Sequence, residues 1–162
     1  MTERERDADL GCPECGQPLT CRQYTHHEKV GIYAVTDSTS HAWQCGSCGE
    51  VALTLTDLAA LQRRAAAIVL RDAKQVTGDV IRYARKSLGL RQVDLAELLD
   101  CASETLSRQE NDKEPMSRPM QLALVAILDG VGLFGGDVDE FIAHERTRPS
   151  LHEFEVPLPR TG

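Results

Sequence analysis

The stretch GLRQVDLAELLDCASETLSRQEN, residues 89–111, predicts two short helices joined by a tight turn. Gly89 is suited to end a preceding helix, because the first position past a helix often needs a positive φ that glycine adopts without strain. Apolar residues at helical spacing then indicate a helix over residues 92–99. A turn over residues 100–102 leads to Ser103, whose hydroxyl suits the N-cap of a second helix that runs to the end of the stretch.

Further helical segments flank this stretch on both sides. Residues 78–88 carry apolar side chains on one face, and residues 118–128 are strongly apolar. Glycines from Gly130 onward predict a flexible loop, and residues 137–146 then predict a last helix. We therefore expect a mostly α protein in which residues 78–146 form a domain of five short helices.

Upstream of the helices, cysteines occur in two matched C-x-x-C-G turns, CPECG at 12–16 and CGSCG at 45–49. Two such turns separated by one loop are typical of a tetrahedral four-thiolate zinc site. Because thiolates fill all four positions, no position remains for a water molecule or a substrate. We predict one structural Zn²⁺ per chain, and the predicted ligands are Cys12, Cys15, Cys45 and Cys48.

The residues around the two cysteine turns favour short strands. Tyrosines and β-branched residues within 20–35, the turn-forming DSTS at 37–40 and the alternation over 51–55 predict a small β domain of the zinc-ribbon type over residues 11–55. Residues 56–77 predict a linker helix with four basic and two acidic side chains. This basic segment fits either a solvated helix between two domains or a surface that faces a partner.

The composition excludes several classes of protein. The chain has 162 residues and a formal net charge of −7, and six cysteines in a reducing compartment are better explained by metal than by disulfides. No apolar run approaches the ~20 residues that span a bilayer, so we expect a cytoplasmic protein without membrane contact. Known catalytic motifs are absent, and we do not expect an enzyme. Residues 1–10 and 147–162 are expected to be disordered.

The helical region resembles a known DNA-binding module. The pattern L-G-L-x-Q-x-x-L-A over residues 88–96, followed by S-x-x-x-S-R-x-E-N over 103–111, resembles the helix-turn-helix of the phage-repressor (Xre) family. The resemblance spans residues 78–128. It implies that the first helix of the motif crosses the DNA backbone and the second enters the major groove. It also implies an internal ion pair between Arg85 and Glu110.

Several polar side chains are candidate DNA contacts under this resemblance. Arg108 is the strongest candidate for base recognition, because a guanidinium group pairs bidentately with guanine. Glu104 either accepts from cytosine or orients Arg108 through an i,i+4 pair. Each basic candidate also fits an ordinary solvated cation. The predicted set comprises Gln92, Ser103, Glu104, Ser107, Arg108, Arg91 and Lys113, with Lys86 and Arg118 as further phosphate contacts.

The order of a four-cysteine segment and then this module is similar to the MqsA (YgiT-type) antitoxin family over residues 12–128. The resemblance implies a zinc domain that blocks a small ribonuclease toxin. It also implies a homodimer that represses its own operon at a palindromic operator in double-stranded DNA. Glu104 stands where that family has a base-reading asparagine, so a different operator sequence is expected. The segment after Gly130 is longer than the resemblance covers.

Two other functions remain open from the sequence. The first is a stand-alone regulator that combines zinc and helix-turn-helix segments but has no toxin. The second is a protein-interaction adaptor whose helix-turn-helix no longer binds DNA, which the acidic net charge of −7 favours. Residues 78–128 contain seven Lys or Arg and eight Asp or Glu, so weak non-specific DNA binding is expected.

Overall fold

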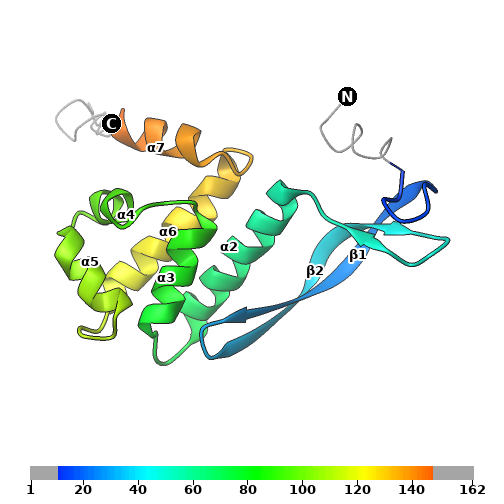
Figure 1. Cartoon of the computed structure of the whole chain (residues 1–162). Helices are drawn as coiled ribbons and strands as arrows, with labels where there is room; N and C mark the ends of the chain where they lie inside the picture. Colours follow the sequence, from blue (N-terminus) through cyan, green and yellow to red (C-terminus); the bar gives the residue numbers. More distant parts are fainter. Residues whose placement is uncertain (1–10, 148–162) are drawn as a thin grey trace, which may run out of the picture.

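The computed structural model describes residues 11–147. The predicted disordered N-terminus and the predicted tail, apart from Thr147, lie outside the described residues. A three-stranded antiparallel sheet is followed by helices, so the predicted order of a small sheet and then a helical region is confirmed (Figure 1). The elements are β1 (Leu19–Val30), β2 (Tyr33–Cys45), β3 (Val51–Ala52), α2 (Leu55–Asp72), α3 (Gly78–Ser87), α4 (Gln92–Leu98), α5 (Ser103–Glu110), α6 (Arg118–Leu133) and α7 (Val138–Arg146).

Strands β1 and β2 form one long hairpin, here called the ribbon. Gly31, with a φ of +59°, makes the reversal at the ribbon tip, and β3 pairs only with the last residues of β2. At the tip Val30 is fully buried, and the Tyr33 hydroxyl donates to the Gln75 carbonyl at 2.6 Å. The tip therefore joins the helical core, whereas the end with the cysteine turns extends away from the helices (Figure 1).

The turn predicted at residues 37–40 is wrong, because these residues lie inside β2. The carboxylate of Asp37 accepts hydrogen bonds from the backbone N–H and the hydroxyl of Thr39 and from the hydroxyl of Ser40. These polar side chains satisfy one another within the strand, beside a register shift in the hairpin, instead of reversing the chain. Arg64 on α2 also contacts Asp37 at 3.1 Å, which ties the ribbon to the helix.

Helix α2 lies at the centre of the molecule and packs against α3 and α6 (Figure 1). It begins where Thr54 and Asp57 form a reciprocal capping box, since each side chain accepts from the other's backbone N–H. Its inner face is built mostly from small side chains, which allow the neighbouring helices to approach closely. The buried side chains of this face include Ala65, Ala66, Ala67, Val69 and Leu70.

Helix α6 is longer than predicted, and the flexible loop predicted from Gly130 is wrong at that residue. A Cβ on Gly130 would lie 3.0 Å from the ring of Phe141, so glycine at this position lets α7 pack closely on α6. Val131 is fully buried and holds this end of the helix in the core. Within residues 11–147 no single helix is long and apolar enough to cross a membrane, although α6 and α7 pass the length and composition test as a pair bent by 113°.

Gly78→Ala is expected to destabilise the protein by about 2–3 kcal/mol, because a Cβ there would overlap the carbonyl oxygen of Glu110. This close approach places the start of α3 directly against the end of α5. Urea unfolding followed by circular dichroism measures the change. Gly132→Ala is the matched control, since a Cβ at that position would have no atom within 4 Å apart from its chain neighbours and the backbone of its own helix, and alanine favours the helix. Equal effects of the two substitutions would contradict the prediction.

Candidate functional site

The four predicted cysteine ligands come together at the far end of the ribbon. Their sulfur atoms all lie within 4.8 Å of one another. The Sγ–Sγ distance is 3.4 Å from Cys15 to Cys45, 3.5 Å from Cys12 to Cys48 and 3.6 Å from Cys15 to Cys48. A tetrahedral zinc site with ordinary Zn–S bonds has sulfur atoms about 3.8 Å apart, whereas a disulfide bond is about 2.05 Å long. The cluster is therefore of a size that could hold one metal ion.

The two cysteine turns have the same local structure. Gly16 donates its N–H to the Cys12 carbonyl at 2.8 Å, and Gly49 donates to the Cys45 carbonyl at 3.1 Å. Both glycines have a positive φ, +72° and +78°, which explains the glycine after each cysteine pair. In each turn the first cysteine is buried and the second is exposed. The matched sequences thus fold into matched turns that face one another.

Backbone N–H groups favour the deprotonated form of one of the four thiols, that of Cys45. The N–H groups of Cys48 and Ser47 lower the pKa of Cys45 to about 6. The Glu50 backbone lowers the pKa of Cys48, but hydrogen bonds with the neighbouring thiols, Cys12 first, and burial raise it to about 12. Four thiolates this close would repel one another. Some of the cysteines therefore keep their protons unless a cation compensates the negative charge of the thiolates. A soft divalent cation fits this donor set.

The other cysteines and the histidines of the ribbon lie outside the cluster. Cys21 is exposed on β1, and Cys101 is half-buried among the helices. His26 contacts Glu28 at 3.2 Å, and His27 contacts Thr36 at the same distance. The candidate metal centre therefore consists of the two cysteine pairs alone within the described residues.

Helices α4 and α5 are joined by a tight turn. Asp100 has a φ of +51°, and the Cys101 N–H donates to the Ala96 carbonyl at 3.0 Å, which closes α4. Leu95 and Leu106 are fully buried and fix both helices to the core. The predicted N-cap is wrong by one residue: Ser103 is the first residue of α5, and Ala102 precedes it at the cap.

The outer side of α5 presents the predicted base-contact residues. Glu104 and Arg108 are exposed, and Ser103 and Ser107 are half-buried. The side chain of Arg108 is 59% exposed, with its Nε 3.7 Å from a carboxylate oxygen of Glu114. Glu104 accepts a 3.4 Å hydrogen bond from Ser103, and no ion pair joins it to Arg108 within residues 11–147. The guanidinium of Arg108 is thus open to an external ligand.

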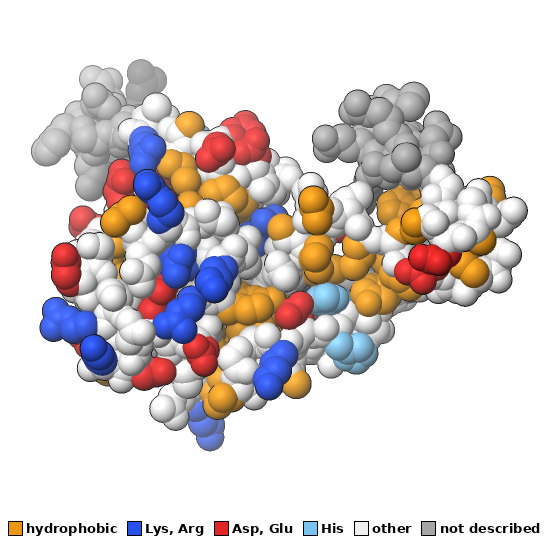
Figure 2. All heavy atoms as spheres, viewed as in Figure 1, with side chains coloured by type: hydrophobic (Ala, Val, Ile, Leu, Met, Phe, Trp, Pro, Cys, Tyr) orange, Lys and Arg blue, Asp and Glu red, His pale blue; other side chains and the backbone are white. Residues whose placement is uncertain are grey.

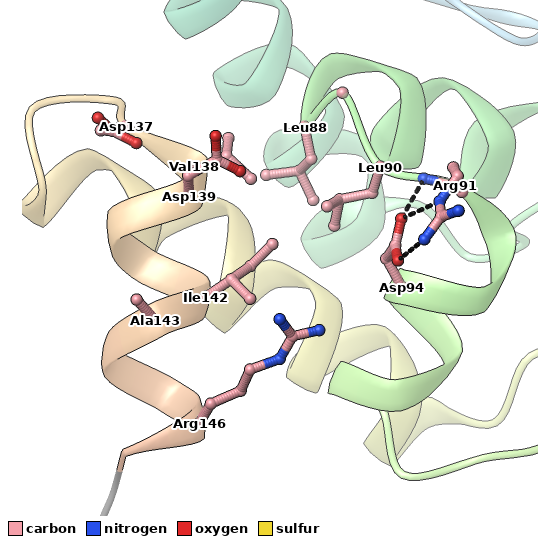
Figure 3. Close-up of a pocket in the computed structure, with 11 residues that line it drawn as sticks. Leu88, Leu90, Arg91, Asp94, Asp137, Val138, Asp139, Ile142, Ala143 and Arg146 are labelled. Atoms are coloured by element: carbon pink, nitrogen blue, oxygen red, sulfur yellow. Dashed lines mark hydrogen bonds and ion pairs between the residues drawn. The ribbon is translucent and has the colours of Figure 1, made fainter.

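Two predicted phosphate contacts have partners inside the protein. The Gln92 amide donates to a buried carboxylate oxygen of Glu110 at 2.8 Å. Arg91 donates twice to Asp94, at 2.9 and 2.8 Å, beside the groove between α4 and α7 (Figure 3). The hydrogen bond from Arg91 lowers the pKa of Asp94 to about 2. The sequence signal for this pair was the acidic residue three positions after Arg91.

The remaining basic candidates differ in their surroundings. Lys86 and Lys113 are exposed. Arg118 donates to the carbonyls of Leu70 and Arg71 at 2.9 and 2.8 Å, so it caps the end of α2. Capping of this kind satisfies carbonyls that have no partner within their own helix. Arg118 therefore has a structural role that the sequence pattern did not indicate.

The ion pair implied between Arg85 and Glu110 is present and buried. The Arg85 Nε lies 2.6 Å from Glu110 Oε1, and its Nη2 lies 3.0 Å from Oε2. Glu110 is only 2% exposed. Burial raises the pKa of Glu110, but the hydrogen bonds from Arg85 and Gln92 outweigh it, so the pKa falls below its usual value. The pair joins α3 to α5 and fixes the position of the exposed face of α5.

The geometry thus separates a cysteine cluster at the end of the ribbon from an exposed polar helix face on α5. Comparison with models of known protein families finds no match, and no curated protein is significantly similar to the chain. The function is therefore inferred from the chemistry of these two features and from the motifs in the sequence.

Proposed function

We propose that this protein is a sequence-specific, DNA-binding transcriptional repressor with one structural zinc ion per chain. The single observation that carries the proposal is the placement of α5. Its inner side chain Leu106 is fully buried, while Arg108 and Glu104 face solvent one helical turn apart. A short helix fixed by its inner face, after a tight turn from a preceding helix, suits insertion into a major groove.

The distribution of charge supports this proposal better than the net charge does. Figure 2 shows that most of the Lys and Arg side chains on this face of the molecule lie over the helices, interspersed with Asp and Glu. One local group of cations is sufficient to meet DNA phosphates. Because the total charge is −7, long-range attraction to DNA is weak and specific contacts contribute a larger share of the affinity.

The donor set supports zinc as the metal. Four thiolates leave no open coordination position, so the ion stabilises structure and carries out no chemistry. It would hold the two cysteine turns and β3 together, where the sheet contributes only a two-residue strand. Cys12, Cys15, Cys45 and Cys48 are the ligands in this proposal.

The outer face of α6 supports a homodimer. Leu122 is 48% exposed and Leu133 is 86% exposed, and the exposed residues Ala126 and Asp129 lie between them on the same face. Asp129 pairs with Arg71 at 3.9 Å. A second copy of the chain would cover the two leucines of this mixed face. A two-fold dimer places two recognition helices ~34 Å apart, which matches a palindromic operator.

The resemblance to antitoxins and the projecting ribbon together suggest the wider role. We propose that the ribbon end binds a small ribonuclease toxin, and that the protein is the antitoxin that represses the shared operon. The ribbon extends away from the helices, so a partner could bind there without covering α5 (Figure 1). A stand-alone regulator without a toxin has the same DNA-binding surface and differs only in this partner.

Arg108→Ala is expected to weaken binding to the specific operator by about 1–3 kcal/mol, because the substitution removes a bidentate base contact. Binding of the full chain to DNA from its own upstream region is measured against random DNA across a salt series. Arg71→Ala is the matched control, since Arg71 is exposed on α2 and outside α5.

The outcomes separate the proposed functions. Equal losses on specific and random DNA would make Arg108 a phosphate contact. Equally weak binding of the unchanged protein to both DNAs would refute the repressor and favour the protein-interaction adaptor. Binding to the operator that weakens as salt rises, and that Arg71→Ala leaves intact, is the expected result.

A further inference from the structure

A cavity of about 470 Å³ lies where the ribbon, the start of α2 and the loop between α6 and α7 meet. The loop lies beside the start of α2 in Figure 1. Small-molecule sites in proteins are roughly 300–1,000 Å³ in volume, so a compact metabolite fits. The lining includes His41 and Trp43 from β2, Thr56, Ala60 and Arg63 from α2, and Gly136 from the loop.

Arg63 is the unusual residue of this cavity. It is only 6% exposed, and no hydrogen bond or ion pair reaches its guanidinium within residues 11–147. Two other arginines of α2 have acidic partners, since Arg64 pairs with Asp37 and Arg71 with Asp129. Burial lowers the pKa of Arg63, and no neighbouring charge opposes that effect. Buried charges are ordinarily paired. The guanidinium of Arg63 is buried without an anion that would compensate its charge.

The surroundings of Arg63 leave space for that anion. Asp57 also lines the cavity, and one oxygen of its carboxylate, Oδ2, accepts from the hydroxyl and backbone of Thr54 in the capping box. The N-terminal end of α2 adds a positive partial charge on the same side. Gly136 has a φ of +87°, and a Cβ there would lie 3.0 Å from the Arg63 Nη2. Glycine therefore lets the loop pass the guanidinium without a side chain that covers it.

We propose that this cavity binds a small organic carboxylate with an apolar body. The planar guanidinium of Arg63 matches a carboxylate through two parallel hydrogen bonds. Trp43, Ala42 and Ala60 are among the residues that line the same cavity, and they suit an apolar or aromatic group. Inorganic phosphate offers the charge without the apolar body, so it binds less tightly. The site requires no DNA, and its occupancy is independent of the proposed repressor function.

The single tryptophan of the chain makes the proposal directly testable, because Trp43 lines the cavity. Full-length protein is titrated with sodium benzoate and, separately, with inorganic phosphate at matched ionic strength, and tryptophan fluorescence is followed. The expected result is a saturable change with benzoate at a concentration at least about tenfold lower than with phosphate, a difference of about 1.4 kcal/mol. Absence of a saturable change with benzoate overturns the proposal, and equal responses overturn the requirement for an apolar body.

Variants locate the binding. Arg63→Met is expected to abolish the benzoate response, whereas Arg71→Met, an exposed arginine on the same helix, is expected to preserve it. Because Arg63 has no partner to lose, Arg63→Met is expected to leave the Tm unchanged or higher. Ala60→Leu keeps the guanidinium and narrows the cavity, and it should weaken the response. A benzoate response that persists in Arg63→Met, that is unchanged in Ala60→Leu, or that disappears in Arg71→Met refutes the site.

Discussion

Arg85→Met is expected to destabilise the folded protein by about 3–5 kcal/mol, because it removes the hydrogen-bonded cation of the buried Glu110 carboxylate and leaves only the more distant Arg82, at 3.9 Å. The two residues are joined by two hydrogen bonds, at 2.6 and 3.0 Å, across the contact between α3 and α5. The lost free energy is mainly the cost of a buried charge that keeps only Arg82, at 3.9 Å, and the Gln92 amide as partners, rather than the strength of the pair itself. Urea unfolding followed by circular dichroism measures the effect.

Two further variants test this explanation. Arg91→Met breaks a similarly short ion pair on the surface and is expected to change the stability little, because the Arg91 side chain is 78% exposed. The double variant Arg85→Met/Glu110→Met removes both charges and should recover most of the stability that the single variant loses. If the double variant is no more stable than Arg85→Met, the unpaired charge is not the cause.

The pH dependence of the same variant has a definite sign. The pKa of Glu110 is lowered in the folded protein, so its contribution to stability is present above the pKa of the unfolded chain and is lost as the pH falls through the folded pKa. In Arg85→Met the carboxyl remains buried without its hydrogen-bonded cation, which raises the pKa of Glu110 relative to the unchanged protein. The destabilisation caused by Arg85→Met should therefore shrink as the pH falls through the pKa of Glu110 in the folded variant, and it should be lost below the lowered pKa of Glu110 in the unchanged protein.

Cys45→Ser is expected to abolish metal binding and to unfold the cysteine end of the ribbon, while α3 to α6 remain helical. Zinc binding contributes about 10–16 kcal/mol in small zinc-finger peptides, and besides the pairing of β1 with β2, which reaches Leu19 and Cys45, only the two-residue β3 holds this end together. Cys45 is buried and has the thiol that deprotonates readily, with a pKa of about 6. The zinc content per chain and the far-ultraviolet circular dichroism report the two effects.

Cys21→Ser is the matched control, since Cys21 is exposed on the same ribbon and outside the cluster. It is expected to keep one zinc ion per chain and an unchanged spectrum. Retention of one zinc ion per chain by Cys45→Ser would contradict the four-thiolate site. Loss of helix signal in that variant would mean that the ribbon and the helices unfold together.

Much of the architecture could be predicted because it depends on local signals. The two C-x-x-C-G turns contain their own hydrogen bonds and glycine conformations, so their spacing predicted the cluster. The helices α3, α4 and α7 begin close to where apolar spacing and capping residues indicated. These features depend on residues within one or two turns of each other.

The N-cap of α5 was misplaced by one residue, which is a local error. The larger errors come from tertiary contacts. The polar residues at 37–40 suit a turn, but pairing with β1 keeps them in a strand. Gly130 suits a loop, but its packing against Phe141 keeps it in a helix. The cavity around Arg63 combines three segments that no local pattern connects.

The ribbon is a long arm that is attached to the helices at one end. Its 12-residue strand β1 extends roughly 40 Å at about 3.3 Å per residue. Its tip is anchored by Val30 and Tyr33, and the pairing of β1 with β2 continues to Leu19 and Cys45, where the cysteine turns begin. Loss of a bound metal ion would therefore release the cysteine turns first and leave the tip of the ribbon in the core. When metal is scarce, the cysteine end of the ribbon would unfold while the helices stay folded.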